Sequence, residues 1–154
     1  MKDSGSNSIF LKEVSLNLLA EGKSLRIKTA GYSMFPAIRP GNVVVIAPVK
    51  TRSNLTTGDI VVFKRDSDFV LHRLTDIRYQ KENAFYITRG DSSLNEDKPI
   101  TLDKIIGVVT TIETKRRKIQ PHRHKIHYRF NRVLVRLIYL WKKLLRIIRL
   151  NSRN

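Results

Sequence analysis

The middle of the chain alternates apolar and polar residues over short stretches, which is the pattern of half-buried β-strands. Glycine, proline, asparagine or aspartate bounds each stretch, and Pro40-Gly41 and Thr57-Gly58-Asp59 are typical of tight turns. The spacing predicts a mainly β fold, a sheet closed into a small, partly open barrel or sandwich. The expected strands are Leu25–Ala30, Val43–Pro48, Asp59–Lys64, Phe69–Ile77, Phe85–Arg89 and Gly107–Glu113.

Before these strands, residues 8–21 have apolar side chains at helical spacing, and Gly22 stands where a helix would end. The pattern predicts a helix that packs on one end of the core. A membrane-entry helix is the alternative, but the segment is short and only modestly charged.

A second helical pattern runs from about residue 129 to residue 150, with apolar residues on one side and basic residues on the other. Its charges recur every few residues, so this helix is expected to lie along an interface and not to cross a membrane. Residues 115–125 before it are basic and include Pro121, and they are expected to form a linker.

With 154 residues, the chain can form one compact domain with short additions. We divide it into residues 1–24 (helix), 25–114 (β domain) and 115–154 (linker and basic helix). The absence of cysteine excludes disulfides, thiolate zinc sites and a cysteine nucleophile. No secretory signal and no apolar stretch of about 20 residues is present, so we expect a cytoplasmic protein, or one peripheral to the cytoplasmic face of the membrane.

The formal net charge is +17, and residues 115–154 hold 14 of the 30 lysines and arginines with no acidic residue. We expect residues 129–150 to bind an anionic membrane surface, which attracts basic amphipathic helices. A partner helix or a second copy, and then nucleic acid, are the other candidate partners, and the oligomeric state stays open. His122, His124 and His127 are interleaved with cations that would repel a metal ion, so no metal or cofactor is expected.

Three short segments carry candidate chemistry. Ser33 lies in Gly31-Tyr32-Ser33-Met34-Phe35-Pro36, directly after an expected strand, where it is either an exposed nucleophile or a turn serine. His72 lies within an expected strand and shares a face with Val70 and Leu74, so it is either a core histidine or a base in a groove. Residues 88–97 end a strand in a polar glycine turn, which alone is typical of an ordinary loop.

Taken together and in order, these segments resemble the type I signal peptidase family, whose superfamily includes the self-cleaving SOS repressors. The resemblance covers residues 25–113. The matching motifs are Gly-x-Ser-Met-x-Pro, Pro-Gly-x-Val-Val-Val, Gly-Asp-Ile-Val-Val-Phe, x-His-Arg-Leu, Thr-Arg-Gly-Asp-x-x-x-x-x-Asp and Ile-Ile-Gly-Val-Val.

The resemblance implies a mainly β serine endopeptidase that binds its peptide or protein substrate as an added strand. Ser33 matches the nucleophile. Most bacterial members have a lysine base where this chain has His72, and a histidine there is similar to the Ser–His branch of the family. Asp91 matches the Gly-Asp of the motif. Asp97 matches the second aspartate and is the better candidate to orient the histidine.

The chemistry of the residues agrees with this assignment. A serine hydroxyl needs a base within hydrogen-bond reach, and a carboxylate on the far ring nitrogen of that base fixes its tautomer. Glu96 and Asp103 are alternative carboxylates. The backbone N–H of Ser33 is the natural oxyanion donor. Many relatives have a second donor, a serine, where this chain has Gly31.

We therefore expect a serine endopeptidase. Members of the family usually begin with membrane-spanning helices, so the resemblance supports peptide-bond hydrolysis better than it supports preprotein processing at the outer membrane face. The main alternative is a non-catalytic module with the same fold, whose basic tail binds a membrane surface or nucleic acid. A self-cleaving repressor is a third reading, but some 24 residues before the β body are too few for a DNA-binding domain.

Overall fold

The computed structural model describes residues 13–49, 51, 55–66, 68–81, 83–121 and 137. The helix expected over residues 129–150 and the histidines at 122, 124 and 127 lie outside these residues, apart from helical, exposed Leu137. The expectation that these histidines hold no metal therefore stays a prediction.

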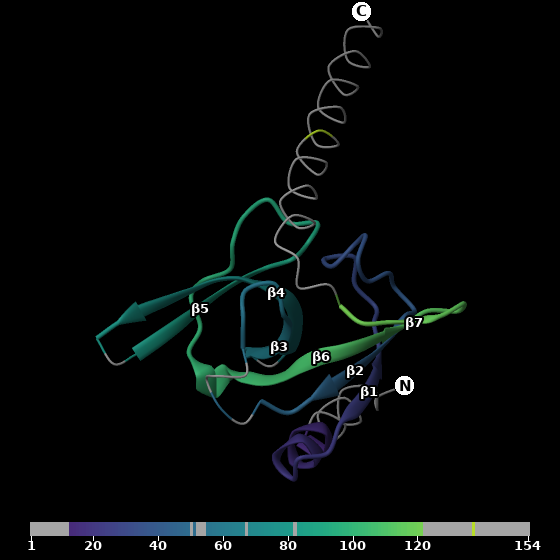
Figure 1. Cartoon of the computed structure of the whole chain (residues 1–154), viewed down its shortest axis with the longest axis horizontal. Coiled ribbons are helices and arrows are strands. Elements are labelled where there is room, and N and C mark those ends of the chain that lie inside the picture. Colours follow the sequence, from purple (N-terminus) through teal and green to yellow (C-terminus); the bar gives the residue numbers. More distant parts are fainter. Residues whose placement is uncertain are drawn as a thin grey trace, which may run out of the picture.

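One open antiparallel sheet forms the body of the molecule (Figure 1). Its strands follow the order β1-β2-β6-β3-β4-β5, and β7 pairs with β6. The strands are β1 (Leu25–Lys28), β2 (Val43–Ala47), β3 (Ile60–Arg65), β4 (Asp68–Gln80), β5 (Asn83–Arg89), β6 (Ile105–Glu113) and β7 (Lys118–Ile119). The prediction of a mainly β fold is confirmed, and each of the six expected strands overlaps one of these.

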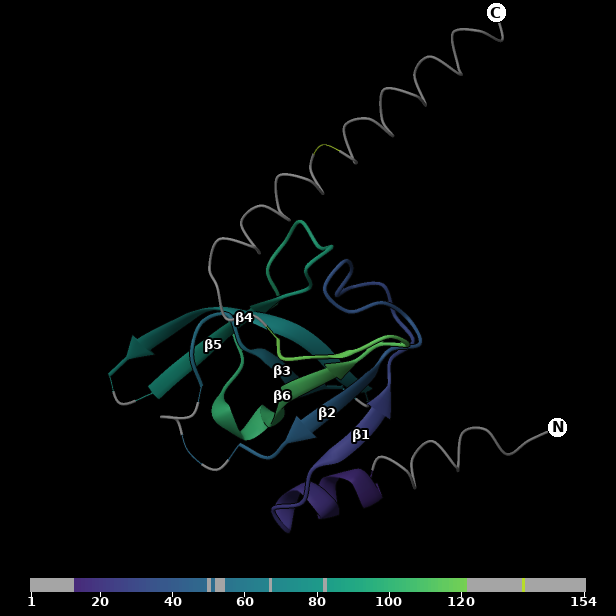
Figure 2. The same ribbon diagram turned by 45° about the vertical axis from the view of Figure 1, so that its right-hand side comes forward.

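The N-terminal helix is described from residue 13 to residue 20 and lies beside β1 (Figures 1 and 2). It ends at Gly22, whose φ of 82° is a left-handed conformation that glycine adopts at little cost. The N–H of Gly22 donates to the carbonyl of Leu19, and the N–H of Lys23 donates to that of Leu18. These two bonds satisfy the last carbonyls of the helix, so Gly22 ends it as the sequence predicts.

Strand β3 separates two apolar clusters. Ile60 and Val62 belong to one cluster, whereas Val61 and Phe63 belong to the other, because successive side chains of a strand point to opposite faces. The first cluster also contains Leu19 of the N-terminal helix and Met34 of the turn after β1. Met34 and Ile38 thus anchor that turn in the core on the C-terminal side of the residue that carries the candidate hydroxyl.

Two elements were not expected from the sequence. Residues 102–104 form a short 3-10 helix, η2 (Leu102–Lys104), just before β6. Strand β7 pairs Ile119 with Ile112 and Lys118 with Glu113, so residues assigned to the linker continue the sheet. Both elements are only two or three residues long, too short for a hydrophobic period to reveal them.

Two loops on the same side of the sheet approach each other (Figure 2). One follows β1 and contains residues 29–42, and the other follows β5 and contains residues 90–99. Ile100 closes the second loop by pairing with Tyr86 of β5, with backbone bonds of 2.8 and 3.0 Å. The candidate residues of the sequence analysis lie on these loops and on the neighbouring strand β4.

Candidate active site

His72 lies in the middle of β4, opposite Val61 of β3. Its side chain is buried, and its ring meets the ring of Phe63 edge-on, with centroids 6.2 Å apart. The face that it shares with Val70 and Leu74 packs on the second apolar cluster. The β-strand therefore fixes the imidazole in one orientation.

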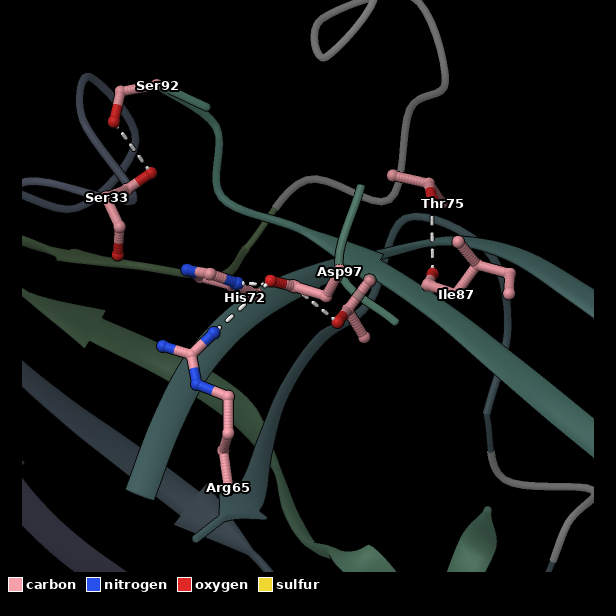
Figure 3. A network of polar contacts seen from close by, with 8 residues as sticks. Ser33, Arg65, His72, Thr75, Ile87, Ser92 and Asp97 are labelled. Atoms are coloured by element: carbon pink, nitrogen blue, oxygen red, sulfur yellow. Dashed lines mark hydrogen bonds and ion pairs between the residues drawn. The ribbon is translucent and has the colours of Figure 1, made fainter. Parts of the chain in front are cut away.

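The Nδ1 atom of His72 lies 2.6 Å from Oδ2 of Asp97 (Figure 3). The Thr88 hydroxyl donates to the same carboxylate oxygen at 2.8 Å, and the N–H of Asp97 donates to the Thr88 carbonyl. Since Thr88 belongs to β5, the strand beside β4, the sheet itself holds Asp97 against the imidazole. A carboxylate at Nδ1 favours the tautomer whose Nε2 can accept a proton.

Arg65, at the end of β3, contributes a second interaction to Asp97. One guanidinium nitrogen lies 3.4 Å from Oδ1 of Asp97, and the Arg65 side chain is half exposed. Partial burial raises the pKa of Asp97, but the hydrogen bonds from His72 and Thr88 and the charges of His72 and Arg65 outweigh it, so this pKa is lowered. Asp97 is therefore a carboxylate at neutral pH.

Ser33 lies in the turn after β1, and the loop after β5 holds its backbone in place. The N–H of Ser92 donates to the Ser33 carbonyl at 2.9 Å. The Ser92 hydroxyl is 3.0 Å from that carbonyl oxygen and 2.9 Å from the carbonyl oxygen of Tyr32. These bonds tie the candidate nucleophile to the loop that also carries Asp97.

Gly90 marks the point at which the Ser33 turn and His72 approach each other. A methyl group at Gly90 would lie 2.7 Å from the Ser33 carbonyl oxygen and 3.1 Å from Nε2 of His72. The Ser33 hydroxyl points toward the Nε2 side of the imidazole (Figure 3), although no hydrogen bond joins them within the described part of the chain. Such bonds are often long in ligand-free enzymes and shorten when substrate binds.

Asp91 lies in a different ion pair. Its carboxylate oxygens accept from Nε and a terminal nitrogen of Arg73 at 2.8 and 2.7 Å, and a further nitrogen of Arg73 donates to the Gly58 carbonyl. Both side chains are buried. The carboxylate against His72 is thus that of Asp97 and not that of Asp91, whose geometry serves to fix the loop after β5. Glu96 and Asp103, the other candidates, are exposed.

A cavity of about 410 Å³ opens beside Ser33 and His72. Apolar side chains of the first cluster make its floor, and the segment of residues 27–31 and the start of β4 form its walls. The side chains that define it include Met34, Ile38, Val44, Ile46, Val62 and Leu71. Lys28 and Arg65 are the lysine and arginine in its lining.

Two sections of strand edge border this cavity. Strand β1 pairs only with β2 among the described strands, and β5 pairs with β4 only from Arg73 onward. Thr29 exchanges backbone bonds with residues 41 and 42, and Leu74 with residues 58 and 59. The N–H and C=O groups of successive residues in a strand point to opposite edges. Those of residues 28 and 30 therefore point away from residues 41 and 42, and those of residues 69 and 71 point away from β3. The cavity therefore lies between two strand edges able to accept another strand.

Gly31 lies two residues before the candidate nucleophile. Gly31 supplies no hydroxyl, and a methyl group built on it would have no heavy atom within 4 Å. The backbone N–H of Ser33 stays the expected oxyanion donor. The position of Gly31 leaves room for a larger side chain.

The described residues contain no group of three or more histidines and carboxylates that could hold a metal ion. None of their helices has the length and apolar character needed to cross a membrane.

Sequence analysis missed four residues of the site: Arg65, Thr88, Gly90 and Ser92. Thr88, Gly90 and Ser92 belong to the quoted Thr-Arg-Gly-Asp segment, so their positions were noted but not their contacts. Arg65 directly follows the expected strand Asp59–Lys64. A basic residue is common at such a position, so the sequence does not indicate that Arg65 contacts Asp97. The contacts of Arg65, Gly90 and Ser92 join segments distant in sequence, whereas Thr88 contacts Asp97 nine residues later.

Comparison with known proteins bears on the same residues. The model of the Peptidase S24-like family matches residues 6–110. Signal peptidase I W of Bacillus subtilis (strain 168) is 29% identical over 77 residues, which are 49% of this chain and 40% of that protein. The chain thus matches about two fifths of the length of this relative.

Proposed function

Because the chain belongs to the Peptidase S24-like family, we propose that it is a serine endopeptidase with Ser33 as nucleophile and His72 as general base. The contact of 2.6 Å between His72 Nδ1 and Asp97 Oδ2, with the Ser33 hydroxyl on the Nε2 side of the ring, carries this proposal. A buried imidazole bonded to a carboxylate on one side and open to a serine on the other is the arrangement that activates a hydroxyl.

In the proposed reaction, Nε2 of His72 takes the hydroxyl proton as Oγ of Ser33 attacks the carbonyl carbon of the scissile peptide bond. The backbone N–H of Ser33 stabilises the resulting oxyanion. The imidazolium, stabilised by Asp97, then returns the proton to the departing amine, and an acyl-enzyme forms. Water, deprotonated by His72, hydrolyses the ester and regenerates the Ser33 hydroxyl.

The substrate is proposed to be an extended peptide or leader segment. Its backbone would bond to the peptide groups of residues 28 and 30 on one side and of residues 69 and 71 on the other, which adds a strand between β1 and β4. Every second side chain would then point into the apolar cavity beside Met34 and Ile38. This arrangement selects small or apolar residues before the cleaved bond.

Cleavage of a peptide library tests this proposal. The full chain is incubated with extended peptides of mixed sequence, and mass spectrometry locates the cleaved bonds. We expect cleavage by the wild type and a loss of at least about a thousandfold in Ser33→Ala and in His72→Ala, since both members of a coupled pair are needed. Ser92→Thr, which keeps a hydroxyl near the Ser33 carbonyl, is the control for disturbance of the turn.

Equal product formation by the wild type and by folded Ser33→Ala would overturn the proposal. Near-ultraviolet and far-ultraviolet circular dichroism of both proteins establishes that the variant is folded. A covalent serine-directed inhibitor gives a second measurement, because its adduct on Ser33 is detected by intact mass without knowledge of the substrate. Labelling of Ser33→Ala at the same stoichiometry would also contradict the assignment.

A further inference from the structure

A second hollow, of about 710 Å³, lies between residues 36–42 and the turn that joins β6 to β7. It is lined by Pro36, Ala37, Arg39, Pro40, Gly41, Asn42, Thr114, Lys115, Arg116, Arg117 and Ile119. Four of these residues are cationic and none is acidic. Because Ser33 lies three residues before Pro36, the hollow borders the same loop as the candidate nucleophile.

The cations of this hollow are not neutralised by a carboxylate of the described chain. Glu113, the acidic residue next to the turn, bonds instead to Arg26 and Lys118. The hydrogen bond from Arg26 is the main reason that the pKa of Glu113 is lowered. Glu113 therefore stays charged and directed toward the strands, and the positive charge of the hollow remains available to an outside anion.

The backbone around these cations is held in place. The N–H of Thr114 donates to the Arg117 carbonyl at 2.9 Å, and the Thr114 hydroxyl donates to the same oxygen at 2.8 Å. The N–H of Arg117 donates back to that hydroxyl at 3.1 Å. On the facing loop, the Arg39 guanidinium lies over the ring of Phe35, 5.8 Å from its centroid. The two sides of the hollow thus present their charges on ordered turns.

The lining also has an apolar part, which indicates the kind of anion. Pro36, Ala37, Pro40 and Ile119 stand among the cations, and Tyr32 and Phe35 of the same loop are exposed, by 72% and 41%. Arginine binds phosphate with two parallel hydrogen bonds, and aromatic rings with basic residues are favoured where headgroups meet acyl chains. A nucleic-acid duplex offers phosphates but no acyl chains for the exposed rings, so a lipid surface fits this combination better.

We propose that this hollow binds the phosphate headgroups of an anionic lipid bilayer, with Tyr32 and Phe35 at the level of the headgroups. The loop that carries Ser33 would then face the membrane surface. This inference does not depend on peptidase activity, since it concerns a separate hollow and a binding measurement that needs no turnover.

Vesicle binding by the full chain is the first test. Phosphatidylcholine vesicles are compared with vesicles that also contain phosphatidylglycerol, for the wild type and for the triple variant Arg39→Gln, Arg116→Gln, Arg117→Gln. Each cation near an anionic surface adds about 1 kcal/mol, so the triple variant should bind about a hundredfold more weakly. The matched control removes three exposed lysines elsewhere: Lys64→Gln, Lys98→Gln, Lys104→Gln.

A dye attached at a single position distinguishes binding by the hollow from binding by residues 129–150. The chain has no cysteine, so Ala37→Cys can carry an environment-sensitive fluorophore at the hollow, and Asn83→Cys can carry it at the start of β5. Anionic vesicles should shift the emission of the dye at residue 37 to the blue and leave that at residue 83 unchanged. The variant Arg39→Lys, Arg116→Lys, Arg117→Lys keeps the three positive charges and should therefore keep most of the binding.

Several results would overturn the proposal. One is the absence of binding to anionic vesicles, and another is an equal loss of binding in the two triple variants. A third is vesicle binding without a response of the dye at residue 37, because the rest of the chain would then make the contact. A DNA duplex that displaces the vesicles and requires the same three arginines would identify nucleic acid as the occupant instead.

Discussion

Nδ1 of His72 and Oδ2 of Asp97 are 2.6 Å apart, although 25 residues separate them in the sequence. The bond joins the middle of β4 to the loop after β5, and Thr88 supports it from the neighbouring strand. The candidate site therefore depends on the pairing of two adjacent strands. Substitutions at this pair and around it separate the chemical roles from the structural ones.

Replacement of Asp97 by asparagine should lower kcat by about a thousandfold to ten-thousandfold while KM changes little. The amide cannot stabilise the imidazolium, and it favours the tautomer with the proton on Nε2, which cannot accept from Ser33. Steady-state kinetics on a cleaved library peptide measures the effect. A loss confined to KM would contradict an orienting role for Asp97.

Asp91 should matter for stability. Asp91→Ala removes the carboxylate that neutralises the buried Arg73 guanidinium and should lower the free energy of unfolding by about 3 to 5 kcal/mol. The double variant Arg73→Met, Asp91→Leu removes both charges and should recover most of this loss. Urea denaturation in a Ser33→Ala background measures both proteins without autolysis. Wild-type stability in Asp91→Ala would show that the pair does not hold the loop.

The pH dependence of stability should reveal the bonds to Asp97. Its pKa is lowered in the folded chain, so the folded state binds a proton more weakly than the unfolded state, where the pKa is about 4. The contribution is full above about pH 4 and is lost as the pH falls through the folded-state pKa. The stability difference between the wild type and Asp97→Asn should therefore shrink in acid. Urea unfolding at several pH values measures the free energy of unfolding of both proteins. A difference between them that stays constant from neutral pH to acid would contradict this prediction.

An alanine at position 90 should separate Ser33 from His72. Its methyl group would lie 2.7 Å from the Ser33 carbonyl oxygen and 3.1 Å from Nε2, so one of the two segments must move. A misplacement of reacting groups by about 1 Å costs about a hundredfold in kcat/KM. Gly31→Ala is the matched control, because its methyl group meets nothing. Equal activity of the two variants would place the reacting groups elsewhere.

Gly31→Ser should increase kcat. The site has space at Gly31, and a hydroxyl there can supply the second oxyanion donor that many relatives of the signal peptidase family have. One such donor is worth about a hundredfold in established cases, and we expect about tenfold from an unoptimised one. Gly31→Ala, measured in parallel, isolates the hydroxyl from the change in backbone freedom. Identical rates for serine and alanine would exclude this donor position.

The strands of the body could be predicted from the sequence because their side chains alternate between a buried and an accessible face. Strand β4 could be located, but its length was underestimated, since its last residues, up to Gln80, are exposed and polar. Strand β7 could not be predicted. Its two residues join the sheet because Ile119 meets Ile112, and no local pattern reports that contact.

The identities of Ser33, His72 and Asp97 as candidates came from motif order, and local chemistry could not choose between Asp91 and Asp97. That choice depends on where Arg73 points. Arg73 alternates with His72 along β4, so the two side chains leave opposite faces of the strand and each meets its own carboxylate. The sequence contains this alternation, but the path of the loop from Gly90 to Asp97 decides which carboxylate reaches which face.

The strand edges beside the cavity also bear on self-association. An unpaired edge accepts any extended chain, so β1 could pair with β1 of a second molecule as readily as with a substrate. Lys28 projects from this edge strand without an ion pair among the described residues, whereas Arg26 is paired with Glu113, so two such edges brought together would bring the uncompensated lysines of the two copies close to each other. Lys28 also lines the cavity, so a charge that discourages pairing between two copies lies beside the site where a peptide is proposed to bind.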